Sequence, residues 1–128
     1  MTPAELKTLR ESLSLPAQWV ANQANVRLRT VQYWEAGRTA VPKDVADMLR
    51  DVDARIDQMA LEALDAYRDA GPVTLYRYSS DSELWENKPD LFPWPAATHA
   101  VMLARLTKML SGAGVASTIQ YHAAENKE

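Results

Sequence analysis

Apolar residues recur at helical spacing over most of this chain, interrupted by short segments of turn-forming residues. The first helical run contains Leu6, Leu9 and Leu13. Residues 2–5 precede it and supply a threonine cap, a proline suited to the first helical position and a capping-box glutamate. The pattern therefore predicts a first helix over residues 3–13.

Two shorter helices follow. The second is predicted over residues 16–24 and ends at Asn25, a residue type that tolerates the left-handed backbone of a helix C-terminus. The third is predicted over residues 28–36 and ends at Gly37. Two short helices separated by three residues are typical of the helix-turn-helix, whose second helix enters the major groove of DNA.

The third helix has two chemically different faces. At about 100° per residue, Val31 and Trp34 lie on one side. The opposite arc carries residues that can contact bases or solvent, namely Arg29, Gln32, Tyr33 and Ala36. Arginine binds guanine and glutamine binds adenine through paired hydrogen bonds. An amphipathic surface helix without a ligand is the alternative, since it also carries polar residues on one face.

The rest of the chain predicts one long helix followed by a mixed α and β region. No proline or glycine interrupts the apolar spacing after Pro42 until Gly71. Two segments then alternate as strands do. The predicted elements are a long helix at 42–70, a strand at 73–78, a short helix at 80–87, a packed irregular loop at 90–95, a helix from residue 95 or 96 to 110, and a strand at 115–122. The fold class is mainly α, with a small C-terminal α+β part containing two short strands.

An apolar stripe along the long helix has two structural interpretations. It can pack inside its own chain, or it can form a dimer seam, and its place directly after a single helix-turn-helix favours dimerisation. The candidate dimerisation residues are Val52, Ile56, Met59, Ala63 and Tyr67. Two strands alone are marginal, so helices must cover them or a partner's strands must join them.

These elements divide the chain into four predicted parts. They are a DNA-binding head (1–44), a helix linking head to body (45–70), a C-terminal dimerisation region (71–122) and a disordered tail (123–128).

Composition limits the function further. The 128 residues carry a net charge of −3, but residues 1–44 hold six basic and four acidic side chains, against eight and thirteen in the remainder. A mildly basic head on an acidic body is compatible with DNA binding through one end. The chain has no cysteine, no signal-peptide pattern and no long apolar run, so we expect a cytoplasmic protein without a membrane partner.

No pattern of catalytic or metal-binding residues emerges. His99 and His122 have no neighbour at metal-ligand spacing, so we expect no metal, cofactor or catalytic residue and no enzymatic activity. Four carboxylates are expected to form a solvated face, and they are Asp81, Glu83, Glu86 and Asp90. Three aromatic residues, Trp85, Phe92 and Trp94, are expected to be core, with a small-molecule pocket as the alternative.

The segment 15–37 resembles the helix-turn-helix of phage repressor and Cro-like (XRE-type) regulators, without a gap. The residues that carry the resemblance are Ala21, Val26, Val31, Trp34, Glu35 and Gly37. It implies a lambda-repressor-like helical domain in which Arg10 and Glu35 form a structural salt bridge. Pro16 and Arg27 depart from the pattern, because many relatives have a capping serine or threonine at these positions.

A narrower likeness extends along most of the chain. The segments 31–42 and 73–78 are similar to anti-CRISPR-associated (Aca-type) autorepressors and their bacterial relatives. That resemblance implies repression of the protein's own operon.

The sequence thus predicts a homodimeric repressor that binds an inverted repeat in double-stranded DNA. Expected base-reading residues are Arg29, Gln32, Tyr33 and Leu28, and expected phosphate contacts are Arg27, Thr30, Arg38 and Lys43. Two alternatives stay open: an antitoxin-like module whose acidic half binds a partner protein, and a regulator that binds a small molecule near Trp85 and Trp94. The sequence does not say whether RNA is also bound.

Overall fold

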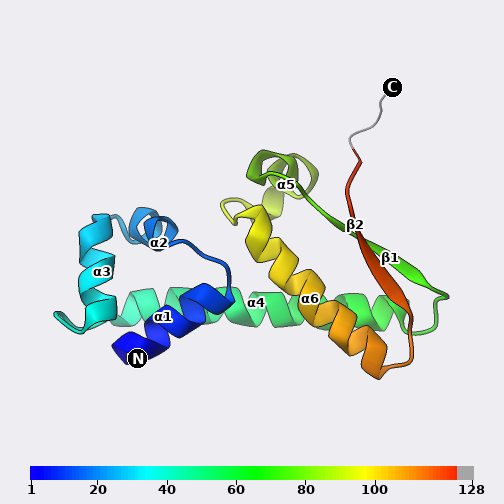
Figure 1. The fold of residues 1–128 in the computed structure, drawn as a ribbon, viewed down its shortest axis with the longest axis horizontal. Helices are drawn as coiled ribbons and strands as arrows, with labels where there is room; N and C mark the ends of the chain where they lie inside the picture. The colour runs from blue at the N-terminus through cyan, green and yellow to red at the C-terminus, as the bar shows by residue number, and fades with distance from the viewer. Residues whose placement is uncertain (124–128) are drawn as a thin grey trace. The chain divides into compact units, whose positions relative to one another are not determined.

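The computed structural model describes residues 1–123 as a mainly helical chain with one short sheet (Figure 1). This confirms the predicted fold class. The chain forms two compact units, Met1–Arg55 and a second that begins at Ile56. Apart from Ala123, the predicted tail lies outside the described residues. Among the described residues, no helix is both long enough and apolar enough to cross a membrane.

The first unit contains helices α1 (Pro3–Ser12), α2 (Ala17–Ala24) and α3 (Leu28–Ala36), followed by the start of α4. The predicted capping box is present, since the Glu5 amide donates to the Thr2 hydroxyl and the Thr2 amide donates to the Glu5 carboxylate. The core of this unit is made of fully or almost fully buried aliphatic side chains, including Leu6, Leu13, Leu15, Val20, Ala21, Val31 and Leu49.

Two left-handed residues end the second and third helices. Asn25 (φ 56°) closes α2, as predicted from its residue type, and Gly37 (φ 80°) closes α3. A side chain on Gly37 would adopt a strained backbone and would also meet the Pro3 ring at 3.6 Å. Because Gly37 ends α3, this helix is nine residues long.

A nearly buried ion pair joins α1 to the end of α3. The Arg10 guanidinium donates to both oxygens of Glu35, from Nε at 2.6 Å and from Nη2 at 3.0 Å. Its Nη1 also donates to the Leu15 carbonyl at 3.0 Å. The side chains are only 12% and 10% exposed, and the hydrogen bond that Arg10 donates to Glu35, with the charge of the carboxylate, raises the pKa of Arg10. The salt bridge implied by the repressor resemblance is therefore present.

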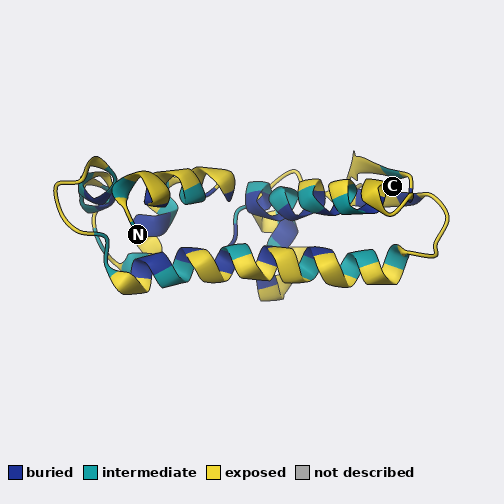
Figure 2. Cartoon of the chain, turned by 90° about the horizontal axis from the view of Figure 1, so that it is seen from below, coloured by how far each residue is buried: buried dark blue, intermediate teal, exposed yellow. Residues whose placement is uncertain are grey.

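The long helix α4 runs over Lys43–Tyr67 and contributes to both units. Its buried positions alternate with exposed ones along its length (Figure 2). Val52 and Ile56 are 8% and 0% exposed within their own chain. They are core residues with almost no surface to offer a second copy, and the predicted dimer stripe is reduced to its half-buried members Met59, Ala63 and Tyr67.

The second unit is built around two parallel strands. Its elements are β1 (Val73–Arg77), α5 (Asp81–Asn87), a 3₁₀ turn η1 (Pro89–Leu91), α6 (Ala96–Gly112) and β2 (Ser117–Tyr121). The strands are in register from Val73 opposite Ser117 to Arg77 opposite Tyr121. Parallel strands need a long crossover connection, and the segment from α5 to α6 provides it.

Helix α6 is fixed to its neighbours by polar contacts as well as apolar packing. Arg105 donates to Asp57 of α4 at 2.8 Å. The Ala96 amide, at the start of α6, donates to Asp81 of α5 at 2.7 Å. The expected solvated face is therefore partly structural, because Asp81 caps a helix.

Glu83 is a second carboxylate with a structural role. It accepts a hydrogen bond from the Ser79 amide at 2.7 Å and lies 3.3 Å from Nδ1 of His122. The bond from the Ser79 backbone, followed by the hydrogen bonds from His122 and the Ser79 hydroxyl, lowers the pKa of Glu83. Glu86 and Asp90 are exposed, as expected of a solvated face.

The aromatic segment differs in part from its predicted role. Trp94 is buried, and its carbonyl accepts a hydrogen bond from the Trp85 indole at 2.8 Å. Phe92 is 63% exposed and meets only the edge of Trp85, with ring centroids 4.8 Å apart. The prediction that Phe92 is core was wrong, because the chain turns through η1 and directs this ring outward.

We predict that removing Arg10 destabilises the fold strongly. Arg10→Met leaves the Glu35 carboxylate and the Leu15 carbonyl without their donor, and the free energy of unfolding should fall by about 3 kcal/mol. Urea unfolding measures this loss. Lys43→Met is the matched control, because its pair with Asp47 is exposed, and it should leave the unfolding midpoint unchanged. Equal effects of the two variants would contradict the structural role of the Arg10–Glu35 pair.

We predict that His99 makes the fold sensitive to acid. His99 is 2% exposed, and burial, with the nearby charge of Lys88, lowers its pKa from 6.5 to about 4. As the pH falls, the unfolded chain binds the proton first, so stability is complete above the unfolded pKa and is lost between that value and the folded one. Between pH ~7.5 and ~5 the free energy of unfolding should fall by about 2 kcal/mol on this account.

Urea unfolding of the wild type and His99→Gln at both pH values measures this contribution. The glutamine variant should lack the His99 component of the loss, whereas His122→Gln should retain it. Identical pH profiles for wild type and His99→Gln would show that His99 is not the responsible group.

Candidate nucleic-acid interface

Helix α3 presents one apolar and one polar face, as its sequence predicts. Val31 is fully buried and Trp34 is 5% exposed, and both pack into the first unit. On the other side Arg29 and Gln32 are exposed, and Tyr33 is half-buried. Three of the expected base-reading side chains therefore lie on one accessible arc of a helix whose opposite side is anchored in the core.

The start of α3 carries two of the predicted phosphate contacts, Arg27 and Thr30, and the predicted base-reading residue Leu28. Arg27 occupies the N-cap position and is exposed, and no side chain caps the helix there. Pro16 likewise gives α2 no side-chain cap. Leu28 and Thr30, on the first turn of α3, are half-buried. The first turn thus offers the Arg27 guanidinium and backbone amides in place of the hydroxyl that many repressors use.

A cation–π contact links Arg38 to the polar arc. Its guanidinium carbon lies 5.2 Å from the centroid of the Tyr33 ring, close enough for attraction between the charge and the ring face. The contact holds the exposed Arg38, just after the end of α3, beside the half-buried Tyr33. Tyr33 is therefore oriented before it meets any partner.

The two lysines near this face differ in their surroundings. Lys43 pairs with Asp47 at 2.6 Å, and the hydrogen bond that it donates to this carboxylate raises the pKa of Lys43. A phosphate would have to compete with Asp47 for Lys43. Lys7 of α1 lines a hollow of about 280 Å³ together with Gln32, Glu35 and Ala36.

The sequence analysis did not identify Lys7 as a neighbour of Gln32. It lies on a different helix from Gln32, and only the packing of α1 against α3 brings the two together. Its exposed position on the amphipathic α1 was the one signal available in the sequence.

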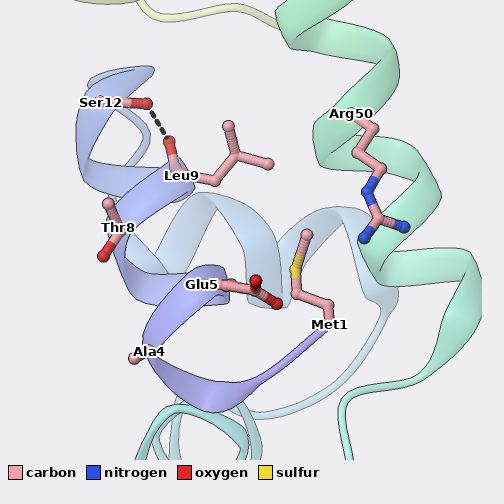
Figure 3. A pocket seen from close by; sticks show the side chains of 7 residues that line it. All are labelled: Met1, Ala4, Glu5, Thr8, Leu9, Ser12 and Arg50. Carbon is pink, nitrogen blue, oxygen red and sulfur yellow. Dashed lines mark hydrogen bonds between the residues drawn. The ribbon is translucent and has the colours of Figure 1, made fainter.

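A larger groove of about 470 Å³ lies elsewhere on the first unit, between α1 and α4 (Figure 3). Glu5 and Arg50 are its charged residues, and the Ser12 hydroxyl donates to the Leu9 carbonyl within it at 2.7 Å. No residue of α3 lines this groove. It is therefore separate from the polar arc of α3.

Comparison with known proteins agrees with this description. The model of the family described as Aca2/YdiL-like matches residues 1–109. The chain belongs to the Aca2/YdiL-like family. Its relatives include the protein named Aca2 repressor from Pectobacterium phage ZF40, which is 36% identical over 93 residues, covering 70% of this chain and 78% of the relative. The match to the Aca2/YdiL-like family includes the whole first unit, α3 among it, and most of the second.

Proposed function

We propose that this protein is a transcriptional repressor that binds a specific DNA sequence through α3 and controls the promoter of its own operon. The observation that carries the proposal is the accessible polar arc of α3, held on a buried apolar face in a chain that belongs to the Aca2/YdiL-like family. The similarity to a protein named Aca2 repressor supports repression as the outcome. It also supports a regulator without enzymatic activity.

Sequence reading is assigned to four residues of α3. Arg29 and Gln32 have the donor and acceptor groups for guanine and adenine edges in the major groove. Tyr33 can donate its hydroxyl, in the orientation set by Arg38. Leu28 can contact a thymine methyl from the first turn.

Phosphate contacts are assigned to the residues around the arc. Arg27 and Thr30 lie at the start of α3, and Arg38 lies after its end, so they can hold the helix at both ends. Lys43 can contribute by exchanging Asp47 for a phosphate. We add Lys7 because it lies beside Gln32. Such contacts orient the protein on the duplex without specifying sequence.

We further propose that two copies bind an inverted repeat. One α3 reads few base pairs, and the first 44 residues carry little net positive charge, so a second copy is needed for tight binding. The second unit offers a surface for this. β2 pairs with β1 along one edge, and its Ile119 and Tyr121 are 43% and 68% exposed. A partner's strands and the half-buried side of α4 can complete this surface.

In this arrangement the two α3 helices enter successive major grooves, with half-sites roughly 34 Å apart. The dimer contacts of α4 are Met59, Ala63 and Tyr67.

Gln32→Ala is expected to relax the preference at one base pair of each half-site. The lost paired hydrogen bonds correspond to about 1–3 kcal/mol of discrimination, and binding to random DNA should not change. Selection of sites from random DNA, followed by affinity measurements on single-base variants, provides the test.

Arg38→Ala is the matched comparison. It should weaken binding to all sequences and reduce the salt slope by about 1. Equal losses on specific and random DNA for Gln32→Ala would contradict its assignment.

The dimer is expected to dissociate when charge is placed on the exposed side chains Ile119 and Tyr121 of β2. Ile119→Lys combined with Tyr121→Lys puts two ammonium groups where a partner is proposed to pack. Sedimentation should then show a monomer, and affinity for the inverted repeat should fall to that for a single half-site. Thr118→Lys, on the opposite face of the same strand, should remain dimeric. A wild-type monomer that binds an asymmetric site would refute the dimer.

A further inference from the structure

A small cavity in the second unit is not used by the proposed DNA interface. Its volume is about 180 Å³, and it is lined by the end of α4, β1, the segment between α5 and η1, and α6. The residues that bear polar groups in its wall are Tyr67, Thr74, Tyr76, Tyr78, Lys88 and His99. It lies within one compact unit, so its shape depends on that unit alone.

The buried histidine in the wall lacks a hydrogen-bond partner. His99 is 2% exposed, and its Nδ1 has no partner among the described residues. Its ring instead packs against Tyr78, with centroids 5.4 Å apart. An unsatisfied buried polar atom costs about 1–3 kcal/mol, and such atoms in folded proteins usually face a ligand, an ion or a water molecule.

The charge in the wall is positive. Lys88 borders the cavity, and no carboxylate of the described residues forms an ion pair with it. Its ammonium is near enough to His99 to lower the pKa of the imidazole, although burial has the larger effect. The Lys88 ammonium would therefore attract a ligand with a negative charge and repel a cation.

The volume of the cavity and the apolar part of its wall indicate the size of the ligand and the character of its uncharged part. The volume corresponds to roughly six water molecules, well below a drug-sized pocket. Leu75, Leu103 and the tyrosine rings make much of the wall apolar. This surface favours a short hydrocarbon body over a fully hydrated ion such as phosphate.

From these observations we infer that the cavity binds a small organic carboxylate. The carboxylate lies between Lys88 and His99, and its short apolar body lies against Leu75, Leu103 and the tyrosines. This site is independent of α3 and of the proposed DNA-binding function. It also differs in place from the pocket near Trp85 and Trp94 considered from the sequence.

The test uses propionate as the probe, with the full-length wild-type protein. The chain has only two histidines, so the ring signals of His99 can be followed by nitrogen–proton NMR during titration. Propionate should shift the His99 signals in a saturable manner. Propionamide, which has the same shape but no charge, should bind about tenfold more weakly or not at all. Inorganic phosphate at equal ionic strength should also bind more weakly than propionate.

Two lysine variants locate the anion. Lys88→Gln should weaken propionate binding by about tenfold or more, because it removes the charge and keeps a polar side chain that is only slightly shorter. Lys108→Gln, on the exposed side of α6, should bind propionate as the wild type does. Thermal unfolding of both variants checks that they are folded.

Three outcomes would overturn the inference. They are the absence of a saturable His99 shift, equal affinities for propionate and propionamide, and equal losses in the two lysine variants. If phosphate bound more tightly than propionate, the inferred organic carboxylate would be wrong and the ligand would be an inorganic anion.

Discussion

The ion pair between Arg10 and Glu35 is the interaction on which the first unit depends most. One guanidinium satisfies two carboxylate oxygens and the Leu15 carbonyl, and so joins α1, the turn before α2 and the end of α3. Because the pair is nearly buried, its geometry is constrained more tightly than that of an exposed pair. The accessible arc of α3 is held at a defined angle because its last turn is fixed in this way.

The same arrangement limits the residues of α3 that the proposed DNA contact can use. Val31 and Trp34 lie in the core and Glu35 in the ion pair, which leaves Arg29, Gln32 and the half-buried Tyr33 on the outer side. Arg38 then orients Tyr33 from beyond the glycine that ends the helix. If α3 reads DNA as proposed, so few residues require either a second copy of the chain or a short target, and the exposed Ile119 and Tyr121 of β2 are the basis for proposing a second copy.

The second unit follows a different constraint. Two parallel strands cannot be joined by a tight turn, so α5, η1 and α6 must pass across the sheet between them. This crossover places α6 against both strands and brings His99 beside Tyr78. It also encloses the cavity that contains Lys88. The buried histidine is thus a consequence of the strand connection, and its low pKa follows from the same burial.

The sequence by itself determined the features that depend on near neighbours in the chain. The capping box at Thr2 and Glu5, the left-handed stops at Asn25 and Gly37 and the two faces of α3 all follow from residues within about four positions of each other. The resemblance to repressors added the pairing of Arg10 with Glu35. Only the tertiary structure decided the parallel pairing of the strands, the outward turn of Phe92, the burial of Val52 and Ile56, and the meeting of Lys7 with Gln32. The physical reason is that these features depend on the path of the chain between distant segments, which local periodicity does not encode.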